Sequence, residues 1–226
     1  MDLSIYGSPQ PFRWTHDFLI KILGTGNLPL VKDPLLLNAF RSIDRADFVP
    51  EEHINDAYTD RNIPLEYDEV LTNPTTIARV LRQLQPVYGG NYLELGGGTG
   101  YVAALIGFIA GEKGKVYSLE RVQWLWERAR QNLRKYSHIK NTEILLRDGS
   151  LGLADKGPYD GILVSFVWDE LEQSLLQQLK IGGKLLVPTS EHQLRQIERL
   201  ADTEFVEEII PEFSAYAFGK IKTGIA

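Results

Sequence analysis

The chain has 226 residues, of which 43% are hydrophobic, with a formal net charge of −6 and no cysteine. The absence of cysteine excludes disulfides and thiolate metal sites, and an acidic chain without a basic block disfavours a nucleic-acid substrate. No run of about 18 apolar residues occurs, and the N-terminus lacks a basic stretch followed by an apolar one. We therefore expect a cytoplasmic protein with no membrane partner.

The N-terminal third predicts a helical cap followed by an irregular loop. Apolar spacing indicates a helix over residues 35–43, with Asp33 as its N-cap and a stop near Asp44. Residues 64–74 show no regular pattern. A second helix is predicted over residues 75–84, because its apolar side chains fall on one face.

Residues 91–101 run from a short apolar strand into a glycine-rich turn, which leads into an apolar helix over residues 102–110. Such glycines allow positive φ angles and the close approach of a ligand. A dinucleotide-binding turn would need its third glycine at Tyr101, so a dehydrogenase is disfavoured. An acidic residue in the strand, Glu94, followed by G-x-G-x-G resembles the first motif of S-adenosylmethionine-dependent methyltransferases. An ordinary strand-to-helix turn is the alternative.

Two further strands are predicted to end in carboxylates. Residues 115–120 end in Glu120, about 20 residues beyond the last glycine, the spacing of a carboxylate that binds ribose hydroxyls. A strand-end charge facing water is the alternative. Residues 142–147 precede Asp148, which could accept the adenine amino group or simply form a turn. Two more strands are predicted within residues 159–164 and, after a turn at residues 181–183, within residues 184–188.

Alternation of these strands with helices predicts an α/β fold, a doubly wound and mainly parallel sheet with helices on both faces. The helix over residues 127–135 is amphipathic and should cover one face. In such sheets ligands bind at the carboxyl ends of the strands. We predict a single domain over residues 1–226, in which residues 1–75 form the N-terminal helical cap and active-site loop and residues 76–226 the cofactor-binding core.

From about Leu36 to Val187 the chain resembles the protein-L-isoaspartate O-methyltransferase family. The resemblance is carried by Phe48-Val49-Pro50 followed by residues 57–65, by the glycine turn, by Asp148-Gly149 and by residues 179–188. It implies transfer of the S-adenosylmethionine methyl group to the α-carboxyl of L-isoaspartyl residues in damaged proteins. The residues that it implies for cofactor binding are Leu71, Glu94, Gly96, Gly97, Gly98, Gly100, Glu120, Arg121, Asp148 and Gly149.

The family's active-site loop is close to Gly-Gln-Thr-Ile-Ser-x-Pro, whereas this chain has Asp-Glu-Val-Leu-Thr-Asn-Pro at residues 68–74. Thr72 keeps the hydroxyl and is the predicted catalytic residue, which would orient the acceptor carboxylate. The alternative is a loop or capping threonine, as Thr75 and Thr76 could equally cap the next helix. Asp68 and Glu69 would weaken the binding of an anionic substrate unless they point away.

Two other segments depart from the family pattern. Residues 166–170 replace a small, alanine-rich stretch with Phe-Val-Trp-Asp-Glu and could narrow the peptide groove, and residues 213–219 replace a Phe-Val-Pro-Leu-like pattern. The departures leave two alternatives to a repair enzyme: a methyltransferase of the same fold with another acceptor, and a cofactor-binding protein that has lost methyl transfer. We expect isoaspartyl peptides as partners and a monomer. We expect no metal, because the four histidines are scattered and interpreted as surface residues.

Overall fold

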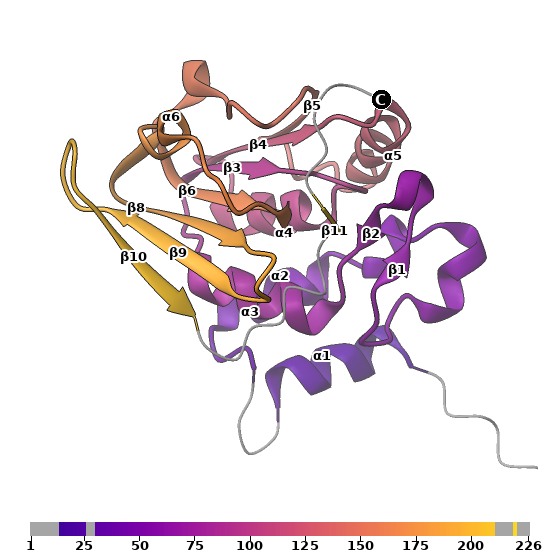
Figure 1. Ribbon diagram of the computed structural model, residues 1–226. Coiled ribbons are helices and arrows are strands. Elements are labelled where there is room, and N and C mark those ends of the chain that lie inside the picture. Colours follow the sequence, from indigo (N-terminus) through magenta and orange to yellow (C-terminus); the bar gives the residue numbers. More distant parts are fainter. Residues whose placement is uncertain (1–13, 26–29, 211–218, 221–226) are drawn as a thin grey trace, which may run out of the picture.

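The computed structural model describes residues 14–25, 30–210 and 219–220. A seven-stranded sheet in the order β10-β9-β8-β6-β3-β4-β5 forms its centre (Figure 1). Its parallel strands are β3 (Asn91–Leu95), β4 (Lys115–Glu120), β5 (Thr142–Leu146), β6 (Tyr159–Val164) and β8 (Leu179–Pro188). Because helices or loops cover both faces of such strands, they are apolar along most of their length.

Helices cover the two faces unequally. One apolar core joins this sheet to α1 (His16–Gly24), α2 (Pro34–Ser42), α3 (Pro74–Leu84), α4 (Tyr101–Ala110) and α5 (Gln123–Arg134). A second core, on the other face, includes Leu175 of the short helix α6 (Gln173–Leu176). The predicted fold class is confirmed, but the second face depends largely on loops and on residues of the sheet itself.

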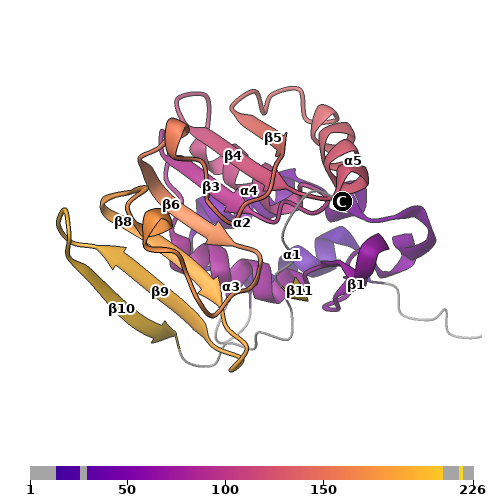
Figure 2. The same cartoon turned by 45° about the horizontal axis from the view of Figure 1, so that its top comes forward.

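Residues 45–71 form short elements beside the carboxyl ends of the strands (Figures 1 and 2). They are η2 (Arg45–Phe48), η3 (Glu51–Asp56), β1 (Ile63–Pro64), η4 (Glu66–Asp68) and β2 (Val70–Leu71), with β1 and β2 paired antiparallel. Arg45 joins the cap to the core: its buried guanidinium lies 5.5 Å from the Tyr101 ring centre and 3.4 Å from the Leu71 carbonyl oxygen. Burial lowers the pKa of Arg45 to about 10, so it remains charged at neutral pH.

The sequence predicted the first residues of some helices better than those of others. Asp33 caps α2 as predicted and accepts the amide hydrogen of Leu35. The cap of α3 is Asn73, which accepts from the Thr76 amide at 2.8 Å, so the threonines proposed as alternative caps were wrong. Helix α5 begins at Gln123 and so includes Trp124 and Trp126, which are partly buried and pack on the core, ahead of the predicted amphipathic stretch 127–135.

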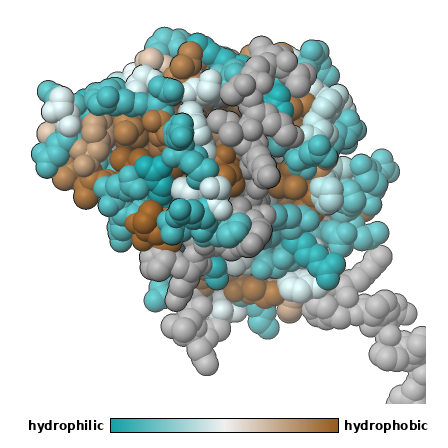
Figure 3. Space-filling view, in the orientation of Figure 1, coloured by the Kyte–Doolittle hydropathy of each residue, from teal (hydrophilic) through white to brown (hydrophobic). Residues whose placement is uncertain are grey.

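The predicted turn at residues 181–183 is also wrong, because β8 continues through it. The irregularity takes the form of a register shift against β6, and Gly182 has a φ of +80°. The hairpin of β9 (Leu194–Arg199) and β10 (Phe205–Ile210) was not predicted. Its strands are rich in charged residues, and Figure 3 shows apolar side chains among them, where Val206 and Ile209 are exposed.

Three remaining expectations fall on other parts of the chain. His16 lies at the surface but is only partly exposed, with Nε2 2.9 Å from the Phe40 carbonyl oxygen. Of residues 213–219, only Gly219 belongs to the part that the structure describes; β11 (Gly219–Lys220) pairs with β7 (Phe166–Val167). Within the described ranges, no helix is long and apolar enough to span a bilayer.

Candidate active site

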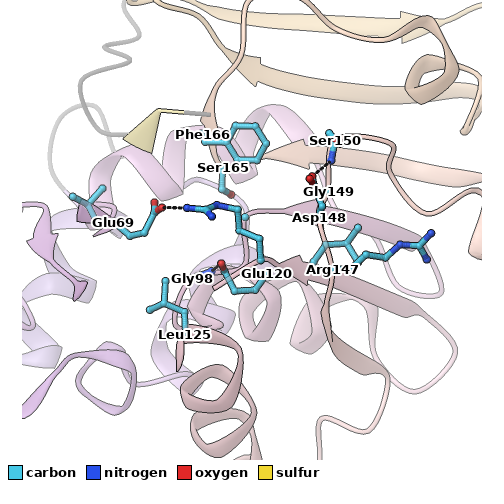
Figure 4. A pocket seen from close by; sticks show the side chains of 14 residues that line it. Glu69, Gly98, Glu120, Leu125, Arg147, Asp148, Gly149, Ser150, Ser165 and Phe166 are labelled. Atoms are coloured by element: carbon cyan, nitrogen blue, oxygen red, sulfur yellow. Dashed lines mark hydrogen bonds and ion pairs between the residues drawn. The ribbon is translucent and has the colours of Figure 1, made fainter. Parts of the chain in front are cut away.

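A cavity of about 650 Å³, open to solvent, lies at the carboxyl ends of β3, β4, β5 and β6 (Figure 4). The residues that line it are Glu69, Val70, Gly96, Gly98, Leu119, Glu120, Arg121, Leu125, Arg147, Asp148, Gly149, Ser150, Ser165 and Phe166.

The glycine turn forms the floor of this cavity. Its first part is anchored by the amides of Gly96 and Gly97, which both donate to the Leu119 carbonyl oxygen, at 2.9 and 3.0 Å. Gly98 has a φ of +53°, and a Cβ there would meet no atom within 4 Å. The turn therefore presents bare backbone to open space, where a ligand can approach closely.

Glu120 connects the turn to the strand beside it. Its Oε2 accepts the Gly98 amide at 2.7 Å, and its Oε1 accepts the Val122 amide at 2.8 Å. Burial raises the pKa of Glu120, while these amide hydrogen bonds oppose the rise. Each carboxylate oxygen has two acceptor positions, so both can also bind ligand hydroxyls.

Six of the predicted cofactor residues lie in the cavity wall, and four do not. Gly96, Gly98, Glu120, Arg121, Asp148 and Gly149 are in the lining, whereas Leu71, Glu94, Gly97 and Gly100 are not. Asp148 lines the cavity, and its Oδ1 accepts the Ser150 amide at 2.9 Å, which confirms the turn; its contact with adenine stays a prediction.

Three of the residues outside the lining support the site from behind. The Leu71 carbonyl faces Arg45, and its side chain is buried. A Cβ on Gly97 would meet the Ser118 hydroxyl, and one on Gly100 would lie 3.1 Å from the Ala129 Cβ. These two glycines allow β4 and α5 to pack closely against the turn, and their direct contact with the cofactor stays a prediction.

Glu94 is fully buried beneath the cavity. The Ser118 hydroxyl donates to its Oε2 at 2.6 Å, and the Ser165 Oγ lies 3.4 Å from its Oε1. Burial raises the pKa of Glu94 to about 8, and the charge of Glu120 adds to the rise. The carboxyl is therefore protonated at neutral pH.

Thr72, the predicted catalytic residue, lines a second and smaller cavity. This cavity measures about 250 Å³, and its other lining residues are Ile77, Val80, Leu81, Val102, Leu163 and Ser165. Thr72 is 9% exposed. Ser165 belongs to both linings, so it marks the boundary between the glycine-turn cavity and the Thr72 cavity.

The carboxylate of Glu69 is compensated by an arginine. Arg121 lies at the end of β4, and its guanidinium is 3.6 Å from Glu69 across the glycine-turn cavity (Figure 4). Both side chains are about four-fifths buried: the exposed fraction is 17% for Arg121 and 21% for Glu69. The neighbouring Asp68 is exposed. The expected repulsion of an anionic substrate is thus reduced at Glu69 by its partner and at Asp68 by solvent.

The bulky segment after β6 was only partly interpreted correctly. Phe166 lines the glycine-turn cavity, but Trp168 is 7% exposed and belongs to the second apolar core. The two rings pack at 5.8 Å between centres. Only Phe166 can narrow a binding site, because Trp168 faces the interior.

Sequence reasoning missed several lining residues: Leu119, Leu125, Arg147, Ser150 and Ser165. Ser165 directly follows β6, and the rule that places ligands at the carboxyl ends of parallel strands could have indicated it. Leu125 lacks any such signal. It lies between two tryptophans on α5, and neither of these lines the cavity; Trp126 instead donates to the Ile144 carbonyl oxygen at 2.9 Å.

The fold resembles solved class I methyltransferases. A candidate isoaspartate methyltransferase from Plasmodium falciparum, crystallised with S-adenosyl-L-homocysteine, superposes with a TM-score of 0.75 at 20% identity and covers 85% of this chain and 92% of its own. A solved protein-L-isoaspartate O-methyltransferase gives a TM-score of 0.76 at 25% identity, covering 93% of this chain and 67% of its own. The architecture is therefore that of a class I methyltransferase.

The sequence defines the family more narrowly. The profile of the protein-L-isoaspartate (D-aspartate) O-methyltransferase family matches residues 18–214. The enzyme of that name from Methanospirillum hungatei is 32% identical over 85% of this chain and 84% of its own length, and one from Archaeoglobus fulgidus is 38% identical over 68% and 71%. The chain belongs to this family of S-adenosylmethionine-dependent methyltransferases, which confirms the resemblance seen in the motifs.

Proposed function

We propose that the protein methylates the α-carboxyl of L-isoaspartyl residues in damaged proteins or peptides, with S-adenosylmethionine as the methyl donor. The observation that carries the proposal is the cavity at the strand ends, where the backbone of Gly98 and the Glu120 carboxylate meet. A nucleoside fits this combination, because its ribose hydroxyls match a buried carboxylate and its bulk needs the space that a Cβ at Gly98 would occupy.

The geometry of the cavity is consistent with the predicted roles of three residues toward the cofactor. Glu120 would bind the ribose, Asp148 the adenine, and Gly98 would allow the close approach of the ligand. When bound, S-adenosylmethionine supplies a methyl group on a sulfonium: the carboxylate oxygen bonds the methyl carbon while the carbon–sulfur bond breaks and its electron pair stays on sulfur. A carboxylate with an ordinary pKa near 4 is already ionised, so the protein needs no general base.

The protein's main task is then to hold the acceptor carboxylate and to exclude water. Holding two reacting groups in line can contribute roughly 7 to 11 kcal/mol. Thr72 would orient the acceptor through its hydroxyl, from the small cavity that borders the glycine-turn cavity at Ser165. The ion pair between Arg121 and Glu69 leaves the acceptor side without an uncompensated buried carboxylate from the loop.

The test uses radiolabelled S-adenosylmethionine with an isoaspartyl peptide and, beside it, the matching aspartyl peptide. We expect label on the isoaspartyl peptide and none on its partner. Cofactor binding without label on either peptide would contradict the repair function and favour one of the two alternatives, another acceptor or a protein that only binds the cofactor. The cytoplasmic location, the monomeric state and the division of the domain near residue 75 remain predictions.

A further inference from the structure

Ser165 is fixed at the boundary between the two cavities. It follows the last residue of β6, and its amide donates to the Leu95 carbonyl oxygen at 2.8 Å, which ties it to the end of β3. It lines the glycine-turn cavity together with Phe166, and it lines the Thr72 cavity as well. An acceptor carboxylate held by Thr72 and directed toward a cofactor in the glycine-turn cavity would lie beside this hydroxyl.

The direction of the Ser165 hydroxyl depends on the protonation state of Glu94: towards an ionised Glu94 it donates to Oε1. The Ser118 hydroxyl donates to Glu94 Oε2, which leaves Glu94 Oε1, 3.4 Å from the Ser165 Oγ, as the place for the carboxyl proton. A protonated carboxyl is a donor on that oxygen. If Oε1 donates to Ser165, the Ser165 hydrogen is available for an acceptor in the cavity.

We propose that Ser165 is a second hydroxyl, in addition to Thr72, that donates a hydrogen bond to the acceptor carboxylate, and that Glu94 is the positioning residue that orients it. The inference rests on the proposed function. A hydroxyl that donates to a carboxylate forms a charge-assisted hydrogen bond. Once Glu94 ionises, the Ser165 hydroxyl donates its hydrogen to Glu94 Oε1. The lone pairs of the Ser165 oxygen then face the acceptor carboxylate, and the hydrogen bond to the acceptor is lost.

The protonated state of Glu94 at neutral pH supports this arrangement. Burial places the pKa of Glu94 at about 8, and Glu120 on the neighbouring strand acts in the same direction. The other charged groups at the cavity are Glu69, Arg121, Arg147 and Asp148. Glu120 also titrates with a raised pKa, but its ionisation would improve ribose binding as the pH rises, the opposite of the effect expected from Glu94.

The first measurement compares turnover of an isoaspartyl peptide by the wild type, Ser165→Ala and Ser165→Thr, with cofactor affinity determined by calorimetry. Ser165→Ala should lower kcat/KM by roughly tenfold to a hundredfold, the effect of losing one hydrogen bond to a charged group, and should change cofactor affinity less. Ser165→Thr keeps the hydroxyl and should restore most of the loss. Ser150→Ala removes a hydroxyl from the glycine-turn cavity alone and should have the smaller effect on turnover.

The second measurement is the pH profile of kcat/KM with an N-acetylated isoaspartyl peptide, for the wild type and Glu94→Gln. The wild type should lose roughly tenfold between about pH 7 and pH 9, as the Glu94 carboxyl ionises. Glu94→Gln should remove this decline, because the glutamine amide can donate to Ser165 and its oxygen can still accept from Ser118 at every pH.

The outcomes separate the two proposals. A wild type that leaves the isoaspartyl peptide unmethylated overturns the proposed function and this role of Ser165 with it. An active wild type whose kcat/KM is unchanged in Ser165→Ala overturns the inference alone. Should Ser165→Ala not fold, the pH profile decides: an alkaline decline that persists unchanged in Glu94→Gln overturns the role of Glu94 and of the hydroxyl that it orients.

Discussion

The two walls of the active site are built in different ways. The cofactor wall consists of the ends of β3 and β4, where five successive residue pairs join the strands and the glycine turn is fixed by hydrogen bonds to Leu119 and Glu120. The acceptor wall, residues 66–72, contains the two-residue strand β2, paired with β1, and a turn in which the Glu69 carbonyl oxygen accepts from the Leu65 amide at 2.9 Å. Within it, Tyr67 and Asp68 both have positive φ angles, of 62° and 57°.

The acceptor wall depends more than the cofactor wall on side chains from distant parts of the chain. The cofactor wall is held mainly by buried parallel strands, whereas the acceptor wall has one short antiparallel pairing and is tied to the rest of the protein by contacts of Arg45 with Leu71 and of Arg121 with Glu69. Backbone in unfavourable φ regions persists where the surrounding structure determines it. We therefore expect substitutions in the cofactor wall to affect binding most, and substitutions in the acceptor wall to affect turnover.

The largest effect should come from the glycine turn. Gly98→Val should weaken cofactor binding by at least about a hundredfold, since a β-branched residue at positive φ adds roughly 1–3 kcal/mol of strain and its side chain takes the ligand's space. Calorimetry measures the affinity, and circular dichroism checks the fold. Gly182→Val is the matched control: Gly182 also has positive φ with nothing near its Cβ position, but it lies outside the cavity. Equal loss of binding in both variants would make the turn merely structural.

Glu120→Ala should weaken binding of both S-adenosylmethionine and its demethylated product. The loss of a hydrogen-bond partner of the ribose should cost roughly 1.5 to 3 kcal/mol, which is about tenfold to a hundredfold in Kd. Glu143→Ala, which removes an exposed carboxylate of β5 outside the cavity, should bind normally. Calorimetric affinities that are alike for the wild type and Glu120→Ala would remove Glu120 from the cofactor site.

On the acceptor wall, Thr72→Val should lower turnover of an isoaspartyl peptide by roughly tenfold to a hundredfold, because one hydrogen bond to a charged group is lost. Cofactor affinity should change little, since Thr72 does not line the glycine-turn cavity. Thr75→Val is a nearby control outside both linings. A fall in cofactor affinity as large as the fall in turnover would mean that Thr72 acts in cofactor binding and not on the acceptor.

The smallest effect should come from the ion pair that joins the walls. A double-mutant cycle with Glu69→Gln and Arg121→Met should show a coupling of at most about 1 kcal/mol in cofactor binding, roughly fivefold, and it should weaken with added salt. The pair of Arg195 and Glu207, on the hairpin far from the lining, serves as a control that should show no coupling to binding. Coupling well above tenfold would mean that the pair holds the cavity shut.

Much of the fold could be predicted from local sequence. The strands over residues 91–95 and 159–164 were found because apolar runs end in turn residues, and Asp33 was found because aspartate before proline is a typical helix start. The β9–β10 hairpin was missed, since polar residues such as Glu207 and Glu208 alternate poorly with apolar ones on an edge strand exposed to water.

The sequence by itself determined the family, the fold class and the order of strand, glycine turn and strand-end carboxylate, because these follow one another at fixed spacing. Only the tertiary structure decided that Glu94 is buried, that Ser165 borders both cavities, and that Glu69 meets Arg121. The contacts of Glu94 with Ser165 and of Glu69 with Arg121 join residues far apart in the sequence, and no local pattern encodes burial of a carboxyl or the partner of a charge. They depend on which strand ends the folded sheet brings side by side.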